Sequence, residues 1–173
     1  MNILVTAIGS FSADCVINSL KSEGHKVVGC DIYPSNWHAV SIDCDNVYQA
    51  PFATKENEYI QFLLDVCKKE QINCIFPLTD LEIDVLNYHR HDFKEEGVAL
   101  FLQSESCLDI ARNKYAMYKL FKDDEQVNLP YSVCSEELTI DFPIPAIAKP
   151  INGRSSEGLR RITRNDELTE LLG

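Results

Sequence analysis

The chain has 173 residues, of which 45% are hydrophobic, and it carries a formal net charge of -11. This length predicts one domain, or one domain with part of a second, and the apolar content argues against global disorder. The acidic balance argues against a general partner of nucleic acid or of anionic membranes, because both need a basic surface.

The seven cysteines are scattered and form no C-x-x-C pair. This pattern favours buried thiols in a reducing compartment over disulfides or zinc sites. The first residues, M-N-I-L-V-T, lack the basic start and the apolar core of a signal peptide. No apolar run approaches the roughly 20 residues that cross a bilayer. We therefore expect a cytoplasmic protein that does not bind membranes.

Apolar runs and helical patterns alternate through residues 2–102. The runs predict strands at residues 2–7, 26–32, 47–50, 73–77 and 98–102. Helical spacing predicts helices at residues 12–23, 54–70 and 79–93. Such alternation is typical of a doubly wound, mostly parallel α/β sheet of the Rossmann-like kind.

Polar residues at the helix starts predict how each helix is capped. Ser12 or Asp14 is expected to cap the first helix, and Thr54 the second. Thr79 and Glu82 have the spacing of a capping box for the third helix.

The loops after the strands carry the candidate substrate-binding residues, because ligands of open α/β sheets lie outside the carboxyl ends of the strands. These residues are Gly9, Ser10, Asp31, Thr79, Asp80 and Glu82. Asp80 is the strongest candidate for a substrate contact, and a second acidic residue near the helix dipole explains its position equally well. Gly9 and Asp31 also have the separation of a dinucleotide-binding turn and its ribose acid, but the turn reads G-S-F-S-A-D and lacks G-x-G-x-x-G.

The pattern changes at Ser104, which is expected to cap a helix over residues 104–111. A second helix is predicted over residues 114–121, and strand material at 127–133 and 144–148. A further strand begins at Leu159, and Asn165 is expected to cap a last helix over residues 166–172. We therefore divide the chain into domains at residues 1–103 and 104–173.

A loop rich in Gly and Ser follows Lys149, in the stretch I-A-K-P-I-N-G-R-S-S-E-G-L-R-R-I. Such a loop can turn its backbone N–H groups toward an anion, and the lysine at its mouth adds a compact positive charge. The candidate phosphate-binding residues are Lys149, Gly153, Ser155, Ser156 and Gly158. An ordinary polar hairpin with a solvated lysine explains the same residues.

Three stretches together resemble the opening of an ATP-grasp domain: R-N-K-Y-A-M-Y-K-L-F, then N-L-P-Y-S, then F-P-I-P-A-I-A-K-P with the Gly-rich loop. The part before them, with P-L-T-D-L-E, resembles the α/β domain that precedes ATP-grasp in carbamoyl-phosphate synthase large chains and in ligases of the pyrrolysine-biosynthesis type. The resemblance implies a ligase that uses ATP and Mg²⁺ to join a carboxylate to an amine through an acyl phosphate.

The same resemblance implies roles for particular residues. Lys114 and Lys149 would reach the nucleotide phosphates, and Lys149 would also lie near adenine. The loop of residues 153–158 would close over the β- and γ-phosphates, although Arg154 and Glu157 depart from the small residues that are usual there. The family's metal ligands lie in the later half of the domain, so we expect them beyond residue 173 and expect this chain alone to be inactive.

Two other functions stay open. The first is a non-catalytic α/β module that binds a small metabolite at the carboxyl ends of its strands. The second is an NAD-type oxidoreductase, which the missing glycines disfavour. The substrates are not specified by these motifs, and a homodimer is an alternative to a monomer.

Overall fold

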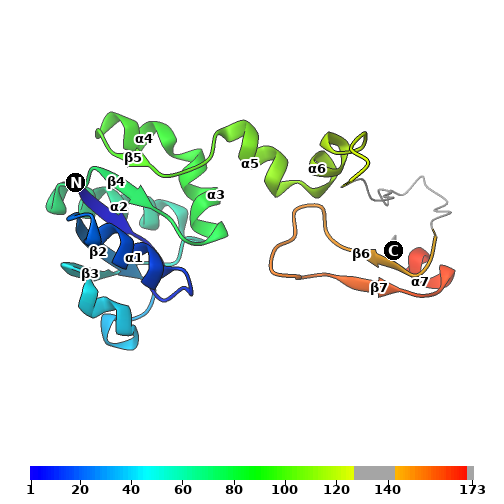
Figure 1. Cartoon of the computed structure of the whole chain (residues 1–173), viewed down its shortest axis with the longest axis horizontal. Coiled ribbons are helices and arrows are strands. Elements are labelled where there is room, and N and C mark those ends of the chain that lie inside the picture. Colours follow the sequence, from blue (N-terminus) through cyan, green and yellow to red (C-terminus); the bar gives the residue numbers. More distant parts are fainter. Residues whose placement is uncertain (127–142, 171–173) are drawn as a thin grey trace. The chain divides into compact units, whose positions relative to one another are not determined.

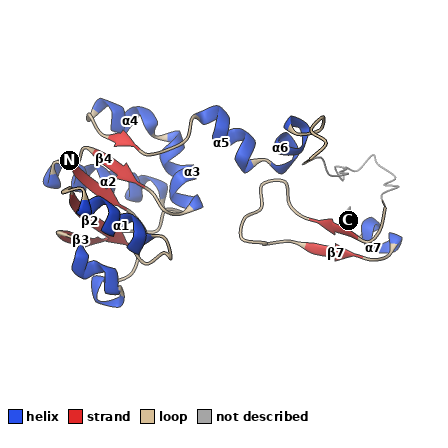
Figure 2. Ribbon diagram, in the orientation of Figure 1, coloured by secondary structure: helices blue, strands red, loops and turns tan. Residues whose placement is uncertain are grey.

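The computed structural model describes residues 1–126 and 143–170. The chain divides into two compact units, Met1–Leu102 and Gln103–Gly173. The first unit contains a five-stranded sheet with its helices, and the second contains two short helices and an antiparallel hairpin (Figure 1, Figure 2).

The sheet of the first unit is parallel throughout, with the strand order β3-β2-β1-β4-β5. Its strands are β1 (Asn2–Val5), β2 (Lys26–Asp31), β3 (Asn46–Gln49), β4 (Cys74–Phe76) and β5 (Ala99–Leu100). The central strand β1 pairs with β2 on one side and with β4 on the other, where Ile3 is in register with Val27 and with Cys74. The strand order reverses between β1 and β4, which makes their carboxyl ends the topological switch point of the sheet.

Helices cover both faces of this sheet, as predicted for a doubly wound fold. They are α1 (Ala13–Ser22), α2 (Glu56–Glu70), α3 (Asp80–Tyr88) and α4 (Arg90–Glu95), with short 3₁₀ turns η1 (Ser35–Trp37) and η2 (Ala39–Asp43). Successive β1 residues point to opposite faces. Ile3 and Val5 pack in one core with Ile17 of α1, and Leu4 packs in the other core with Leu63 of α2.

The capping predictions are wrong at two helices of the first unit. Thr79 occupies the N-cap of α3 without a side-chain capping bond, because its hydroxyl donates instead to the Glu82 carboxylate at 2.7 Å. Thr54 lies in a turn closed by a bond from the Lys55 N–H to the Phe52 carbonyl, and α2 begins only at Glu56.

Two other helix predictions need adjustment. Ser12 is the N-cap of α1, but its side chain makes no capping bond. The single helix predicted over residues 79–93 is two helices, α3 and α4, which meet at His89.

The second unit begins with α5 (Glu105–Arg112) and α6 (Lys114–Leu120). Ser104 caps α5 as predicted, since its hydroxyl accepts the Cys107 N–H. Asn113 caps α6 in the same way by accepting the Ala116 N–H at 2.9 Å. Each of these two helices is therefore capped by the residue that immediately precedes it.

The hairpin pairs β6 (Ala146–Ala148) with β7 (Arg160–Ile162), with Ile147 opposite Arg161. The last helix, α7, spans Asn165–Thr169, so Asn165 is its first residue and not its cap. Its amino end is closed by Glu167, whose carboxylate accepts the Thr163 and Arg164 N–H groups. The strand predicted at residues 127–133 and the end of the predicted last helix lie outside the described residues.

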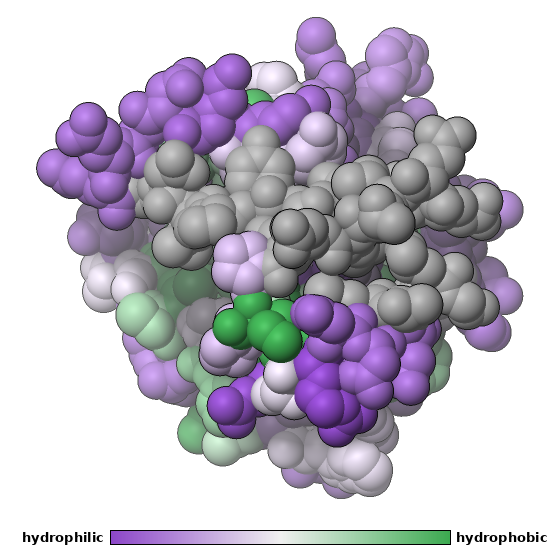
Figure 3. Space-filling view, turned by 90° about the vertical axis from the view of Figure 1, so that its right-hand side faces the viewer, coloured by the Kyte–Doolittle hydropathy of each residue, from purple (hydrophilic) through white to green (hydrophobic). Residues whose placement is uncertain are grey.

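Among the residues that Figure 3 colours by hydropathy, hydrophilic side chains prevail, and a small hydrophobic group lies near the centre of the view. Within the described residues, no helix has the length and apolar character needed to span a membrane.

Candidate functional site

The Asp31 carboxylate connects two loops at the carboxyl edge of the sheet. The side chain is 7% exposed and stands at the end of β2. Its Oδ2 accepts the Gly9 N–H at 2.8 Å, and its Oδ1 accepts the Tyr33 N–H at 3.0 Å. Both oxygens are thus engaged by backbone N–H groups, so Asp31 holds the two loops together.

His38 covers the turn that contains Gly9. An ideal β-carbon on Gly9 would lie 2.6 Å from Cε1 and 2.7 Å from Nδ1 of the His38 ring. The Nε2 atom of His38 lies 3.3 Å from Asp31 Oδ1, yet it is buried without a hydrogen-bond partner in the described part of the chain. Gly9 is therefore the residue type that leaves room for this imidazole.

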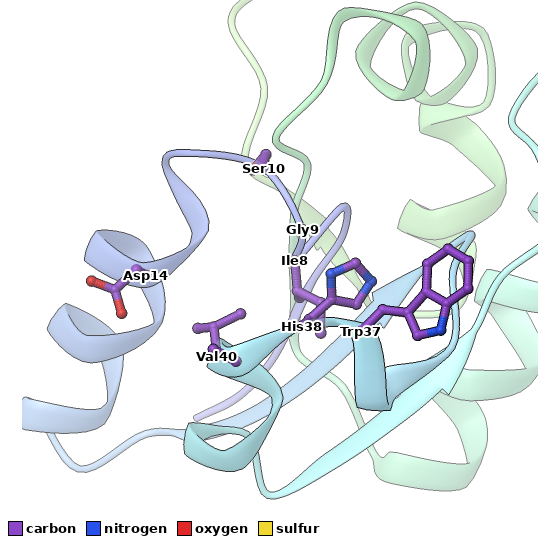
Figure 4. Close-up of a pocket in the computed structure, with 8 residues that line it drawn as sticks. Ile8, Gly9, Ser10, Asp14, Trp37, His38 and Val40 are labelled. Atoms are coloured by element: carbon purple, nitrogen blue, oxygen red, sulfur yellow. The ribbon is translucent and has the colours of Figure 1, made fainter.

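A cavity of about 230 Å³ opens beside this turn (Figure 4). Its apolar lining comes from Ile8, Ala39 and Val40, and its polar lining from Ser10, Asp14 and His38. The cavity joins the loop after β1 to the η1 and η2 segment, so it brings together two of the six predicted substrate-binding residues, Gly9 and Ser10.

Glu82 and Thr79 belong to a buried network. The Glu82 carboxylate, in a residue 8% exposed, accepts hydrogen bonds from Thr6 Oγ1 at 2.8 Å, Thr79 Oγ1 at 2.7 Å and Tyr59 Oη at 2.8 Å. Burial, together with the nearby Glu82 charge, raises the pKa of Tyr59 well above its usual value. The network joins β1, α2 and α3, and the predicted substrate contacts of these two residues gain no support from it. Asp80, at the first position of α3, stays a prediction.

In the second unit, one of the two predicted phosphate-binding lysines belongs to α6 and the other contacts it. Lys114, the first residue of α6, donates from Nζ to the Gly153 carbonyl at 2.5 Å, and its backbone N–H donates to the Ile151 carbonyl. Lys149 places its Nζ 5.5 Å from the centroid of the Tyr118 ring. Tyr118 follows Lys114 by four residues, so the two side chains share one face of α6.

The Gly-rich loop is folded around Pro150. An ideal β-carbon on Gly158, where φ is 70°, would lie 2.7 Å from Cγ of this proline, and one on Gly153 would lie 3.1 Å from its Cβ. Ser155 and Ser156 take left-handed φ values of 50° and 61°. The loop therefore needs glycine at residue 158 for space and for its backbone conformation, and a side chain at residue 153 would be in tight contact with Pro150.

The exposed face of the hairpin carries apolar and cationic residues. Ile147 of β6 lies opposite Arg161 of β7, and Lys149 and Leu159 directly adjoin these strands at the loop, where continued alternation would place them on the same face. Ile147 is 55% exposed and Leu159 is 47% exposed, while Ile162 on the opposite face is 2% exposed. This face offers an apolar floor next to the lysine.

Sequence reasoning missed His38 and Tyr118. The spacing of four residues from Lys114 could have indicated Tyr118, but no local pattern marks His38 as the inward-facing residue of an exposed segment. Among the described residues, no three His, Cys, Asp or Glu side chains gather closely enough to hold a metal ion.

Comparison with protein families now identifies the first unit. The model of the PylC-like N-terminal domain matches residues 3–101, which is more than half of the chain. The chain belongs to this PylC-like family. The PylC-like match coincides with the five-stranded unit and confirms the resemblance inferred from the sequence motifs. A comparison with curated proteins finds no match.

Solved structures of ATP-grasp enzymes share the fold of this PylC-like chain. The L-amino acid ligase of Bacillus licheniformis aligns with 99% of the chain at a TM-score of 0.66 and 13% identity, over 41% of its own length. The biotin carboxylase domain of Hydrogenobacter thermophilus 2-oxoglutarate carboxylase, a dimer in complex with MgADP, aligns with 98% of the chain at 0.70 and 16% identity, over 39% of its own length.

A third structure, N5-carboxyaminoimidazole ribonucleotide synthetase of Thermotoga maritima, aligns with 99% of the chain at a TM-score of 0.65 and 18% identity, over 43% of its own length. The chain thus spans about two fifths of these enzymes. At such low sequence identities, these structural alignments show a common fold and nothing finer. They confirm the predicted α/β class.

Proposed function

We propose that the protein containing this chain is an ATP-dependent carboxylate–amine ligase. Residues 1–103 form its pre-ATP-grasp domain, and residues 104–173 form the first part of its ATP-grasp domain. The observation that carries the proposal is that Lys114 of α6 bonds to the Gly-rich loop at Gly153, while Lys149 lies against Tyr118 of the same helix.

Charge supports the assignment of the phosphate site. ATP carries about four negative charges, which two ammonium groups and a set of backbone N–H groups can offset. The Lys114 ammonium now donates to a neutral carbonyl, that of Gly153. A phosphate oxygen is a stronger acceptor than this carbonyl, because the bond is then between two charged groups.

The hairpin supplies a surface suited to the base. Ile147 and Leu159 are half-exposed on the face that also carries Lys149. A purine ring placed on these side chains would remove apolar surface from water, at about 25 cal/mol for each Å² buried. The phosphates would then lie toward the loop, near Ser155, Ser156 and Gly158.

The reaction needs ATP, a carboxylate and an amine. ATP would supply the phosphoryl group that converts the carboxylate into an acyl phosphate, with Mg²⁺ bridging the phosphates. Lys114 and Lys149 would hold the transferring phosphates, and the loop would keep water from the intermediate. Gly9, Ser10, Asp31 and Asp80 are proposed to face the substrates at the carboxyl edge of the sheet.

A titration of the 173-residue chain with MgATP, followed by ¹H–¹⁵N NMR, tests the nucleotide site. Binding is expected to be weak and hydrolysis negligible, because the chain spans about two fifths of the matched enzymes. The amide signals of Gly153 and Gly158 are expected to shift in a saturable way. Lys114→Ala and Lys149→Ala should each weaken binding about tenfold, the loss of one charged hydrogen bond.

Lys119→Ala is the matched control. Lys119 lies on the same helix and places its Nζ 4.6 Å from the Tyr115 ring, so it imitates the Lys149–Tyr118 contact away from the loop. An equal loss of binding in all three variants, or no loss in the first two, would refute the proposed site.

The alternative function is a non-catalytic module that binds a small metabolite. The cavity beside Gly9 favours this function, because it lies in the PylC-like unit and includes none of the lysines. Binding of a metabolite that is unaffected by Lys149→Ala, in a chain that shows no response to MgATP, would support the alternative.

A further inference from the structure

We propose that Tyr118 is a positioning residue of the nucleotide site, and that its ring holds the Lys149 ammonium in place for a phosphate. The inference rests on the proposed function and goes one step beyond it, because it assigns a role to a side chain that would bind no phosphate itself. It is carried by the contacts that the hairpin and its loop make with α6.

The first argument is the freedom of Lys149. Its side chain is exposed and directly follows β6, and its ammonium forms no ion pair or hydrogen bond with another residue that the structure describes. The Tyr118 ring has its centroid 5.5 Å from Nζ, within the limit of about 6 Å for attraction between a cation and a ring face. A lysine loses rotamer freedom when it binds a ligand, and a partner that already holds it reduces that loss.

The second argument is the chemistry of the partner. A ring attracts an ammonium through its π face and adds no net negative charge. A carboxylate in the same place would offset the charge of Lys149 and repel phosphates. The ammonium has three N–H donors, and those directed away from the ring can still reach a phosphate oxygen. The contact with Tyr118 is therefore compatible with a bound nucleotide.

The third argument is the position of Tyr118 on α6. Lys114 precedes it by four residues and shares its helix face. Lys114 donates its backbone N–H to the Ile151 carbonyl at 3.0 Å and its Nζ to the Gly153 carbonyl at 2.5 Å. One helix face thus contacts the start of the loop at Lys149 and its continuation at residues 151 and 153. The ring therefore fixes one ammonium relative to the other, as two cations that meet one triphosphate require.

The contact is tested first without nucleotide, by ¹H–¹³C NMR of the 173-residue chain. The current of an aromatic ring shifts the signals of protons above its face upfield, so the ε-methylene signals of Lys149 are expected upfield of those of an unstacked lysine. Lys149→Ala identifies them by their disappearance. Tyr118→Phe should keep the upfield position and Tyr118→Leu should lose it. An unchanged position in Tyr118→Leu would overturn the proposal.

The role in binding is tested by titration with MgATP, followed at the Gly153 and Gly158 amides. Tyr118→Leu should weaken binding about two- to fivefold, the size of one cation–π contact at an exposed site, and Tyr118→Phe should restore it. In a Lys149→Ala background, Tyr118→Leu should cause no further loss, because the ring acts through this lysine. Additive losses, or tighter binding by Tyr118→Leu, would overturn the proposal.

Tyr115→Leu is the matched control. It removes the contact of Lys119 with the Tyr115 ring, at 4.6 Å on the same helix, and should bind MgATP like the unmodified chain. The β7 amide signals show whether the hairpin is intact in each variant, and Tyr118→Gln replaces the leucine variant if leucine disturbs it.

The same titrations separate this inference from the proposed function. If Lys149→Ala weakens MgATP binding and Tyr118→Leu does not, the positioning role is refuted and the phosphate site stands. If Lys149→Ala leaves MgATP binding unchanged, the phosphate site itself is refuted, and the role of Tyr118 is refuted with it.

Discussion

The imidazole of His38 occupies the space that a β-carbon of Gly9 would fill, with Cε1 2.6 Å from that position. The segment around it, from Ser35 to Asp43, contains no buried residue. The His38 side chain is 10% exposed, and Val40 packs against the core that contains Ile8. The His38 ring and Val40 therefore both hold this segment against the first unit.

Gly9→Ala is expected to destabilise the first unit by about 1–3 kcal/mol, the usual cost of forcing an extra carbon into a packed site. In a His38→Ala background, the same substitution should cost less than about 1 kcal/mol, because the clashing ring is gone. Urea unfolding of the four proteins in this double-mutant cycle measures both values. An equal cost in the two backgrounds would show that the ring is not what excludes a side chain at residue 9.

Glu82 is expected to be among the most sensitive residues of the first unit. Glu82→Ala leaves the hydroxyls of Thr6, Thr79 and Tyr59 without their common acceptor, so the free energy of unfolding should fall by about 3 kcal/mol or more. Glu58, which is exposed and pairs with Lys55 at 3.2 Å, is the control, and Glu58→Ala should change stability by less than about 1 kcal/mol. Similar values for the two variants in denaturant unfolding would argue against the buried network.

His89 is expected to make stability depend on pH. Its ring contacts Asp92 at 2.7 Å and Glu56 at 2.8 Å, and the bond to Asp92 is the main cause that raises the pKa of His89. The folded state thus holds the proton more tightly than the unfolded state. The stabilisation is complete below the unfolded pKa of about 6.5, and is lost as the pH rises through the folded value.

Comparison of the unmodified chain with His89→Gln measures this contribution. The difference in unfolding free energy should be larger at pH 5.5 than at pH 8.5, by about 0.5–1 kcal/mol, the size of a partly exposed ion pair. His91→Gln serves as the control, because His91 is 78% exposed and lies 3.7 Å from Glu95. A difference that grows with pH would contradict the assignment.

Much of the fold follows from local sequence. Apolar runs located all five strands of the first unit. The runs are longest at β1 and β2, because strands buried on both faces read as continuous hydrophobic segments. The error at Thr79 has an identifiable origin. A hydroxyl, amide or carboxylate at a helix start has several acceptors and donors within reach, and Glu82 turned inward to Thr6 and Tyr59, which are far away in sequence.

The candidate sites could be predicted only in part. Lys114 and Lys149 were found by motif, and the contacts that join them to α6 and its loop required coordinates. His38 could not be predicted, since nothing in Y-P-S-N-W-H-A-V distinguishes the side chain that turns inward from the exposed Trp37 beside it. The contact depends on a glycine 29 residues earlier in the chain.

The position of β1 bears on how the chain acquires its structure during synthesis. The first strand to leave the ribosome is the centre of the sheet, and its second neighbour is β4, where Ile3 pairs with Cys74. The nascent chain therefore cannot complete its sheet until residue 76 has emerged, and until then one edge of β1 has no strand to bond with. Parallel strand pairing between residues so distant in sequence forms slowly during folding. This protein should therefore depend on chaperones more than a helical protein of equal size.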